Sequence, residues 1–202
     1  MIAKIGIDLS MNSTGLVLDF INDDNVRITK FVQICPSIMK VSGDVQLVTY
    51  KRDYRKDNYS YEDLSAVNSA TSLASCINKQ MIKWSEIYNF DQIDARIEGS
   101  IMSSRFSKAT ANLNQLTVFN GTVKRMLLVH PLVVSIAVIG PTSLKKYFTG
   151  KGNAKKELMI TKFIETFPMF DRSNKVKIDD IADAYALSIA QISDSMKYFK
   201  QN

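Results

Sequence analysis

The sequence of 202 residues predicts an α/β fold in one domain, with a mixed five-stranded sheet and helices on both faces. Two observations predict it. The chain begins with three short β-rich runs separated by turn-forming residues, which is typical of an antiparallel meander. Apolar β-branched runs then alternate with long stretches of helical spacing, which favours parallel strands joined by crossover helices.

The predicted strands are short runs rich in Ile, Val and Leu. They lie at residues 2–9, 14–21, 26–34, 93–98 and 132–140. The predicted helices follow from apolar residues repeated every three or four positions. They cover about 61–88 and 106–129, a short helix opened by Pro141, then 154–167, and a closing helix from about 180 to 198.

Residues 36–60 interrupt this pattern and are interpreted as an insertion in the domain. The segment contains a possible short strand, VQLVTY, and a basic stretch, KRDYRKDNY, in which tyrosines alternate with cations. Such a composition suits backbone contacts and base stacking on a nucleic acid, and it equally suits an ordinary surface hairpin.

The composition limits the partners and the metal chemistry. The 26 basic and 20 acidic residues give a formal charge of +6, which suits an anionic partner such as nucleic acid, although a merely soluble basic surface is also compatible with it. One histidine and two cysteines exclude a site with several His or Cys ligands, so any metal would be a hard ion held by oxygen.

No signal peptide or membrane span is expected, because Asp8 interrupts the first apolar run and no apolar stretch reaches about 18 residues. The expected location is cytoplasmic or nucleoid-associated, with an organelle matrix or a viral origin also possible, and secretion is not expected.

Acidic residues stand where the sequence predicts strand ends and a helix start. Asp8 lies in the first strand and Glu98 ends the fourth, while Asp180 and Asp183 share one face of the closing helix. Burying a carboxylate costs several kcal/mol unless a cation or hydrogen bonds compensate. Converging carboxylates would repel each other, and two Mg²⁺ or Mn²⁺ ions would relieve that repulsion and support phosphodiester cleavage. Each acid also has an ordinary explanation, and Asp179 is a candidate N-cap.

Four segments in series resemble RuvC-like Holliday junction resolvases of the ribonuclease H-like superfamily. They are IGIDLSMNSTG, the Ile-Glu that ends the next predicted strand, SLKKYFTGKGNAKKE, and DDIADAYALSIA. The resemblance covers most of the chain and implies a ribonuclease H-like fold. It places the metal ligands on Asp8, Glu98, Asp180 and Asp183, with Asp179 competing for the third position, and it places further catalytic residues on Lys145 and Lys156.

A basic surface accompanies these acids. Expected DNA contacts come from the lysine-rich segment and from the residues after Glu98, namely Lys145, Lys146, Lys151, Lys155, Lys156, Arg105 and Lys108. A solvated lysine-rich loop is the alternative.

The resemblance therefore implies a Mg²⁺-dependent endonuclease for four-way and related branched DNA junctions, with two ions per site and Mn²⁺ as a substitute. It also implies a homodimer that pairs through the helix after Glu98. Two other functions stay open. The opening IGIDLS…STG also resembles the first phosphate loop of actin-like ATPases and sugar kinases, and a non-catalytic junction-binding module on the same fold is the third possibility.

Overall fold

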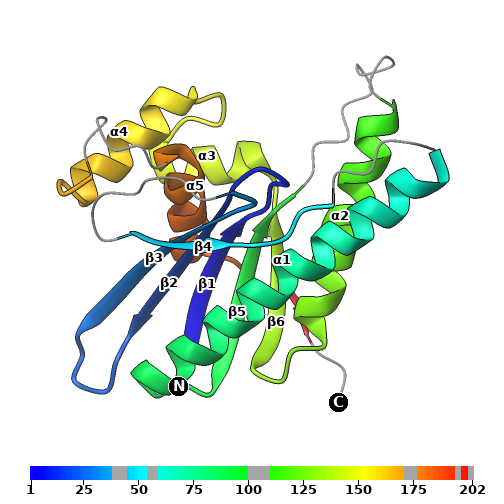
Figure 1. The fold of residues 1–202 in the computed structure, drawn as a ribbon. Coiled ribbons are helices and arrows are strands. Elements are labelled where there is room, and N and C mark those ends of the chain that lie inside the picture. Colours follow the sequence, from blue (N-terminus) through cyan, green and yellow to red (C-terminus); the bar gives the residue numbers. More distant parts are fainter. Residues whose placement is uncertain (38–44, 54–58, 100–109, 171–176, 194–196, 200–202) are drawn as a thin grey trace.

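A computed structural model describes residues 1–37, 45–53, 59–99, 110–170, 177–193 and 197–199 of the chain (Figure 1). Its centre is a seven-stranded sheet with the order β4-β3-β2-β1-β5-β6-β7. The strands are β1 (Ile2–Asp8), β2 (Thr14–Ile21), β3 (Arg27–Cys35), β4 (Val45–Thr49), β5 (Gln92–Glu98), β6 (Val133–Ile139) and β7 (Lys197–Phe199).

The sheet combines the two predicted strand patterns. β1, β2 and β3 form an antiparallel meander, and β1, β5 and β6 run parallel to one another. The mixed sheet is therefore confirmed, but the count of five strands is wrong. β4 pairs parallel with β3 inside the segment interpreted as an insertion, and β7 pairs antiparallel with β6.

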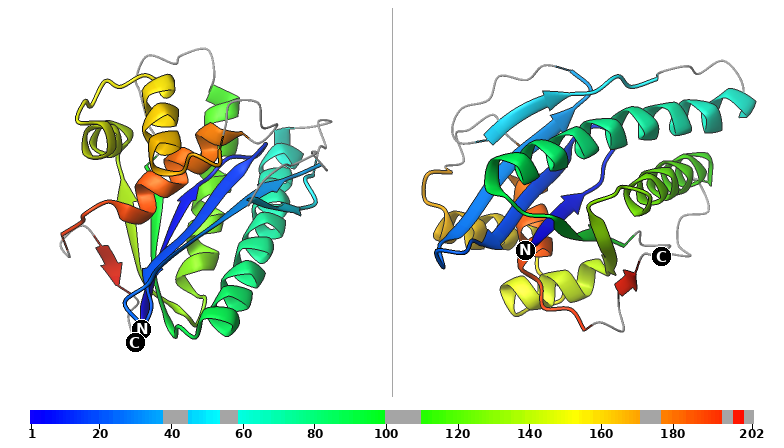
Figure 2. Two further views of the ribbon diagram at one scale, coloured as in Figure 1. Left: turned by 90° about the vertical axis from the view of Figure 1, so that its left-hand side faces the viewer. Right: turned by 90° about the horizontal axis from the view of Figure 1, so that it is seen from below.

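The helices lie on both faces, as expected. They are α1 (Tyr59–Tyr88), α2 (Thr110–Leu128), α3 (Pro141–Thr149), α4 (Lys156–Thr166) and α5 (Ile178–Ile189). Figure 2 shows the sheet between α1 and α2 on one side and α3, α4 and α5 on the other. The prediction that the last helix continues to residue 198 is wrong, because α5 ends at Ile189 and β7 follows. The carbonyls of Ser188 and Ala190 at this end accept hydrogen bonds from the Arg96 side chain, a tertiary contact that sequence periodicity does not reveal.

Alternating residues of each strand serve the two faces. In β1, Ala3, Ile5 and Ile7 belong to the apolar cluster under α1 and α2. The intervening Gly6 faces α5, where its backbone lies against Ala184 and Ser188. Asp8 is two residues further along β1, so it stands on the same face as Gly6.

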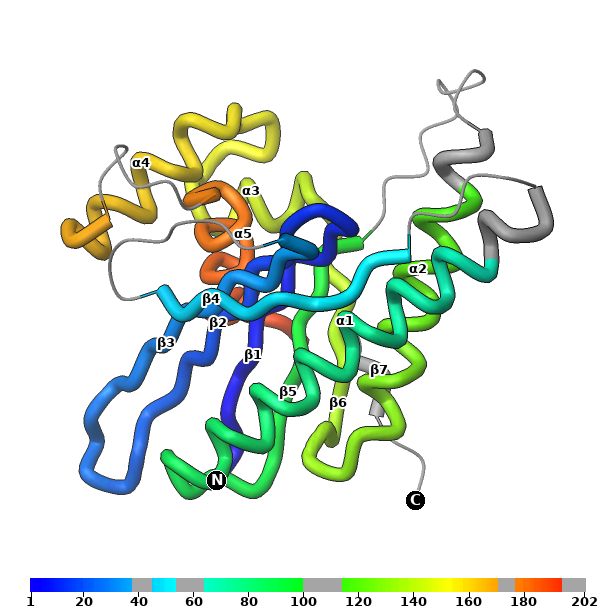
Figure 3. The backbone as a smooth tube through the Cα atoms, in the orientation of Figure 1, coloured from blue at the N-terminus to red at the C-terminus, as the bar shows by residue number. Residues whose placement is uncertain are grey.

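After β4 the chain passes the β1–β2 loop on its way to α1 (Figure 3). The Tyr50 hydroxyl donates to the Met11 carbonyl, the Arg52 guanidinium donates to Asn12, and the Lys51 amide donates to Ser72 Oγ at 3.1 Å. Tyr50, which precedes the basic stretch, is buried, so its ring is not available for base stacking, one of the two interpretations left open for this segment. Tyr54 lies outside the described residues.

Within the described ranges, each helix is too short or too polar to cross a lipid bilayer.

Candidate active site

The carboxylates singled out in the sequence lie at one edge of the sheet. Asp8 ends β1 and Glu98 ends β5, and these two strands are parallel neighbours in which Ile7 stands opposite Ile97. Both carboxylates therefore leave the sheet at its carboxyl edge. Asp180 and Asp183 come from the first two turns of α5, which packs on the same face.

Two glycines let α5 approach the sheet at backbone distance. A Cβ on Gly6 would lie 1.8 Å from the Ala184 carbonyl oxygen, and one on Gly15 would lie 2.1 Å from the Asp180 carbonyl oxygen. Gly15 stands opposite Asp8 in the β1–β2 pair. The helix backbone at Asp180 thus rests directly on the strand beside Asp8, and this contact brings the acids of α5 to the acid of β1.

The acids interact electrostatically across these elements. Burial, followed by repulsion from Asp183, Asp180, Glu98 and Asp179 in that order, raises the pKa of Asp8 to about 8. Burial, followed by repulsion from Glu98, raises the pKa of Asp183 to about 7. The pKa of Glu98 is also raised by burial, and the nearby Lys145 opposes this shift. Raised carboxylate pKa values of this kind mark a site where negative charge is concentrated.

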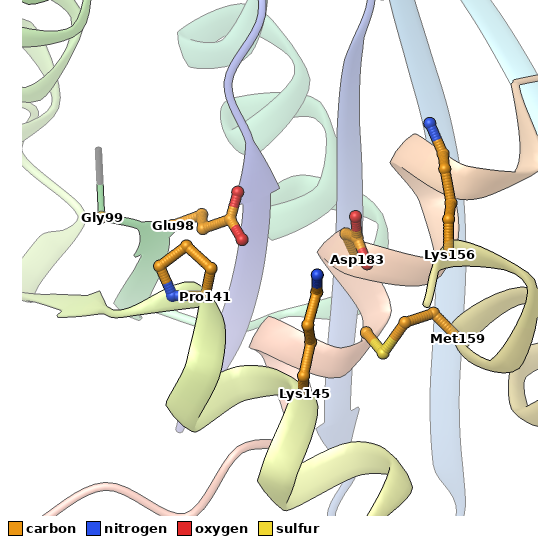
Figure 4. A pocket seen from close by; sticks show the side chains of 7 residues that line it. All are labelled: Glu98, Gly99, Pro141, Lys145, Lys156, Met159 and Asp183. Carbon is orange, nitrogen blue, oxygen red and sulfur yellow. The ribbon is translucent and has the colours of Figure 1, made fainter. Parts of the chain in front are cut away.

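Lysines from α3 and α4 face this cluster. A cavity of about 440 Å³ is lined by Glu98, Gly99, Pro141, Lys145, Lys156, Met159 and Asp183. In Figure 4 the Lys145 ammonium points toward the space between Glu98 and Asp183, and the Lys156 side chain extends past Asp183 with its ammonium directed away from Glu98. The cavity therefore presents two carboxylates and two cations, an arrangement suited to a phosphate group held beside metal ligands.

The two neighbouring acids at the start of α5 have different surroundings. Asp179 forms an ion pair with Lys156, and α5 begins at Ile178 with Lys177 as its N-cap, so the expectation of Asp179 as an N-cap is wrong. Asp180 contacts Ser13, which lowers its pKa, but burial outweighs this and the pKa is raised to about 6. Its Oδ2 atom is buried and, among the described residues, has no hydrogen-bond partner.

The carboxylates are not gathered around one point. In the described part of the chain, no group of three or more acidic, histidine or cysteine side chains is arranged to hold a metal ion. The donors themselves fit a hard divalent cation, because all are carboxylates and the buried Asp180 Oδ2 still lacks a partner within the described residues.

The other predicted DNA contacts lie outside the cavity. Lys146 is exposed on α3, Lys151 is exposed in the turn that follows, and Lys155 is the exposed N-cap of α4. Arg105 and Lys108 lie outside the described residues.

Some residues that shape the site were not singled out in the sequence. Ser13 is fully buried; it contacts Asp180, and its Oγ accepts a hydrogen bond of 2.8 Å from Gln33 Nε2. Gly6 and Gly15 were also missed, although a glycine inside a strand signals close approach of another backbone.

Comparisons with known proteins bear on the fold. No family model matches the sequence, and no curated protein matches it in a sequence comparison. Among solved structures, RuvC of T. thermophilus in complex with a Holliday junction substrate aligns with a TM-score of 0.50 and 12% identity, over 93% of this chain and 91% of that one. The chain has a RuvC-like fold.

Two further solved structures are similar over most of this chain. One is another structure of Thermus thermophilus RuvC, at 14% identity and a TM-score of 0.44, over 92% of this chain and 90% of that one. The other is the yeast mitochondrial Holliday junction resolvase Ydc2, at 14% identity and a TM-score of 0.48, over 92% of this chain and 75% of that one.

Proposed function

We propose that the protein is a Mg²⁺-dependent, structure-selective endodeoxyribonuclease that cuts four-way DNA junctions and related branched DNA by phosphodiester hydrolysis. One observation carries the proposal. On a RuvC-like fold, four carboxylates from β1, β5 and α5 interact at one sheet edge beside Lys145 and Lys156. A protein without metal or phosphate chemistry gains nothing from this concentration of charge, which costs folding free energy.

The four acids Asp8, Glu98, Asp180 and Asp183 are the residues that would hold two Mg²⁺ ions, or Mn²⁺ in their place. When bound, the ions supply Lewis-acid chemistry for hydrolysis of the phosphodiester. The proposal assigns Lys145 and Lys156 to neutralising the phosphate that enters the cavity. Lys146, Lys151, Lys155, Arg105 and Lys108 would contact the flanking DNA backbone, which makes affinity fall steeply with salt.

The raised pKa values give the proposal a pH signature. Carboxylates bind metal in their ionised form, so metal binding must displace protons from Asp8 and Asp183, whose pKa values lie at about 8 and about 7. Metal affinity and cleavage are therefore expected to rise from pH 6 to pH 8.

The decisive experiment compares conservative variants on labelled DNA. Synthetic four-way junction, fork and linear duplex are incubated with and without Mg²⁺. Asp8→Asn, Asp180→Asn and Asp183→Asn are expected to bind the junction but not to cut it. Asp179→Asn is the matched control, because Asp179 pairs with Lys156, and it is expected to keep cutting. Full cleavage by Asp8→Asn or Asp183→Asn would refute the proposed function.

A four-way junction offers two equivalent strands, so a symmetric dimer with two sites is the expected assembly. We propose α2, which follows β5, as the dimer interface; Leu116 on this helix is 41% exposed. Light scattering on the wild type and on Leu116→Glu tests this, and a monomeric wild type would exclude it.

A junction-binding module without catalysis is the second candidate, favoured by the absence of a ready-made metal-ligand group among the described residues. Calorimetry with Mn²⁺ at neutral pH distinguishes the two. Uptake supports the nuclease, and no uptake supports the binding module.

A further inference from the structure

Arg96 is a buried cation in the middle of β5, with 3% of its surface exposed. Its Nε and Nη2 donate to Asp94 Oδ2 at 3.3 and 3.1 Å, and Asp94 Oδ1 accepts a hydrogen bond of 2.6 Å from Ser135 Oγ on β6. Its Nη1 donates to the Ser188 carbonyl at 3.0 Å and also to the Ala190 carbonyl. Arg96 thus connects β5 to the end of α5, and its partner Asp94 connects β5 to β6.

This network joins the two elements that carry the facing carboxylates of the cavity. Arg96 precedes Glu98 by two residues, so both side chains stand on the same face of β5, about 7 Å apart along the strand. The bonded carbonyl of Ser188 lies five residues after Asp183 on α5, about 7.5 Å further along the helix. Arg96 therefore links the strand that carries Glu98 to the helix that carries Asp183 through a few short, directional contacts.

The contacts of α5 differ between the strands beneath it. On β1 and β2 the helix rests on Gly6 and Gly15, with no side chain between the backbones. On β5 the Arg96 side chain reaches across to the helix end, where a cation also interacts favourably with the helix dipole. The glycine contacts fix α5 relative to Asp8, and Arg96 fixes it relative to Glu98.

Stability alone does not require this pair. A buried ion pair is often no more stabilising than well-packed apolar residues of similar volume. The network restricts geometry more than it stabilises the fold. A planar guanidinium bonded to a carboxylate and to two helix carbonyls allows few relative positions of strand and helix.

We propose that Arg96 is a positioning residue that sets the distance between Glu98 and Asp183, and through it the affinity of the acid cluster for divalent metal. The inference rests on the proposed function, since it assigns Arg96 a role in that same site.

The test measures Mn²⁺ affinity by calorimetry and, separately, kcat and KM for junction cleavage. Arg96→Met is expected to weaken Mn²⁺ binding at least tenfold and to lower kcat at least tenfold, with KM within twofold of the wild type. Arg96→Lys keeps the charge but not the planar contacts, so its Mn²⁺ affinity and kcat should lie between those of the wild type and Arg96→Met. Lys162→Met is the control, because Lys162 forms an exposed ion pair of 2.8 Å with Glu165 inside α4, so its loss removes a cation without removing a contact between strand and helix. It is expected to leave both measurements within twofold.

A second control distinguishes a general loss of stability from a displacement of Glu98 relative to Asp183. Met81→Ala removes buried volume on α1, which packs on the opposite face of the sheet. This variant should bind Mn²⁺ normally at a temperature where it is as folded as Arg96→Met. If Arg96→Met does not fold, Arg96→Lys and Ser135→Ala carry the test, with smaller shifts in the same direction.

Wild-type Mn²⁺ affinity in Arg96→Met, or an equal loss of Mn²⁺ affinity in Met81→Ala, would overturn the inference about Arg96. Neither result would contradict the proposed nuclease function. A wild-type protein that takes up no Mn²⁺ would overturn the nuclease, and this inference with it.

Discussion

The two faces of the central sheet differ in the charge that they carry, although the same strands build both. Under α1 and α2, the aliphatic residues of β1 and β5 belong to an apolar cluster that also contains Trp84 of α1 and Phe119 of α2. Toward α3, α4 and α5, Val17, Phe31 and Val45 of β2, β3 and β4 belong to a second apolar cluster, whereas β1 and β5 contribute a glycine, acids and a buried arginine. Both faces therefore contribute apolar packing to stability, and the second also carries concentrated charge, which lowers stability.

β5 shows the contrast most directly. Its residues toward α1 and α2 are Ile93, Ala95 and Ile97, and the alternate residues are Asp94, Arg96 and Glu98. A strand with a period of two can thus belong to a core and to a site at once. The comparison teaches that the position of the site follows from the core, because strands fixed on one face leave little freedom to their side chains on the other.

The largest expected effect concerns the face toward α3, α4 and α5, here called the charged face. It tests whether this face needs backbone contact with α5. Gly6→Ala would place a Cβ 1.8 Å from the Ala184 carbonyl oxygen, so the helix must move. We expect a loss of more than about 3 kcal/mol in the free energy of unfolding, measured by urea denaturation.

Gly121→Ala is its control, because a Cβ there meets nothing within 4 Å and the residue lies within α2. It should gain about 0.5–1 kcal/mol. A mild effect of Gly6→Ala would show that the charged face tolerates a displaced helix.

The second effect is the pH dependence of stability without metal. Asp8, Asp183 and Asp180 have folded-state pKa values of about 8, 7 and 6 against an ordinary 3.8. The folded state therefore holds more protons than the unfolded state, and the stability present below pH 4 is lost as pH rises through 6 to 8. In EDTA, Asp8→Asn should be more stable than the wild type by about 1–3 kcal/mol at pH 8.

The same two proteins should have nearly equal stability at about pH 3, below the ordinary pKa of 3.8, where Asp8 is mostly protonated in both the folded and the unfolded state. Thermal unfolding at the two pH values checks this. An advantage of Asp8→Asn that does not change with pH would contradict the raised pKa.

The third effect tests whether packing in the cluster under α1 and α2 influences the acids on the opposite face of the sheet. Ile77→Val removes one methylene group from α1 inside the cluster under α1 and α2. Stability should fall by about 1 kcal/mol while junction cleavage stays at the wild-type rate. A large loss of cleavage in the folded protein would mean that the two faces are coupled more tightly than the strands suggest.

The smallest effect on stability is expected from Lys156→Met. Its side chain is 61% exposed and pairs with Asp179, so unfolding should change by less than about 1 kcal/mol. Lys156 lowers the pKa of Asp183, so that pKa should rise in the variant, which an NMR titration would detect. An unchanged Asp183 pKa would show that Lys156 does not interact electrostatically with the acid cluster.

Sequence patterns anticipated the elements whose periodicity is strong. The three meander strands, β5, β6 and the two long helices follow from apolar spacing, and each lies within a few residues of its predicted range wherever the structure describes it. β7 was missed because three residues carry too short a pattern, and because the apolar spacing of α5 continues into the residues after Ile189.

The site was anticipated in residue type more than in arrangement. Acids at strand ends were visible in the sequence, and the structure brings Asp8, Glu98, Asp180 and Asp183 to one edge. The sequence could not separate the roles of Asp179 and Asp180, since that difference depends on Lys156 and Ser13, which are remote along the chain. The Arg96 network was equally hidden, because its partners lie up to 94 residues away.

The bare backbone contact at Gly6 and Gly15 has an evolutionary consequence. Because no side chain separates α5 from β1 and β2 there, the spacing of helix and strands does not depend on the sizes of the surrounding core residues. Aliphatic positions such as Ile5 and Ile7 are free to drift among residues of similar volume, while positions 6 and 15 are restricted to glycine. A lineage can therefore replace most of its core and still preserve the distance between its acids.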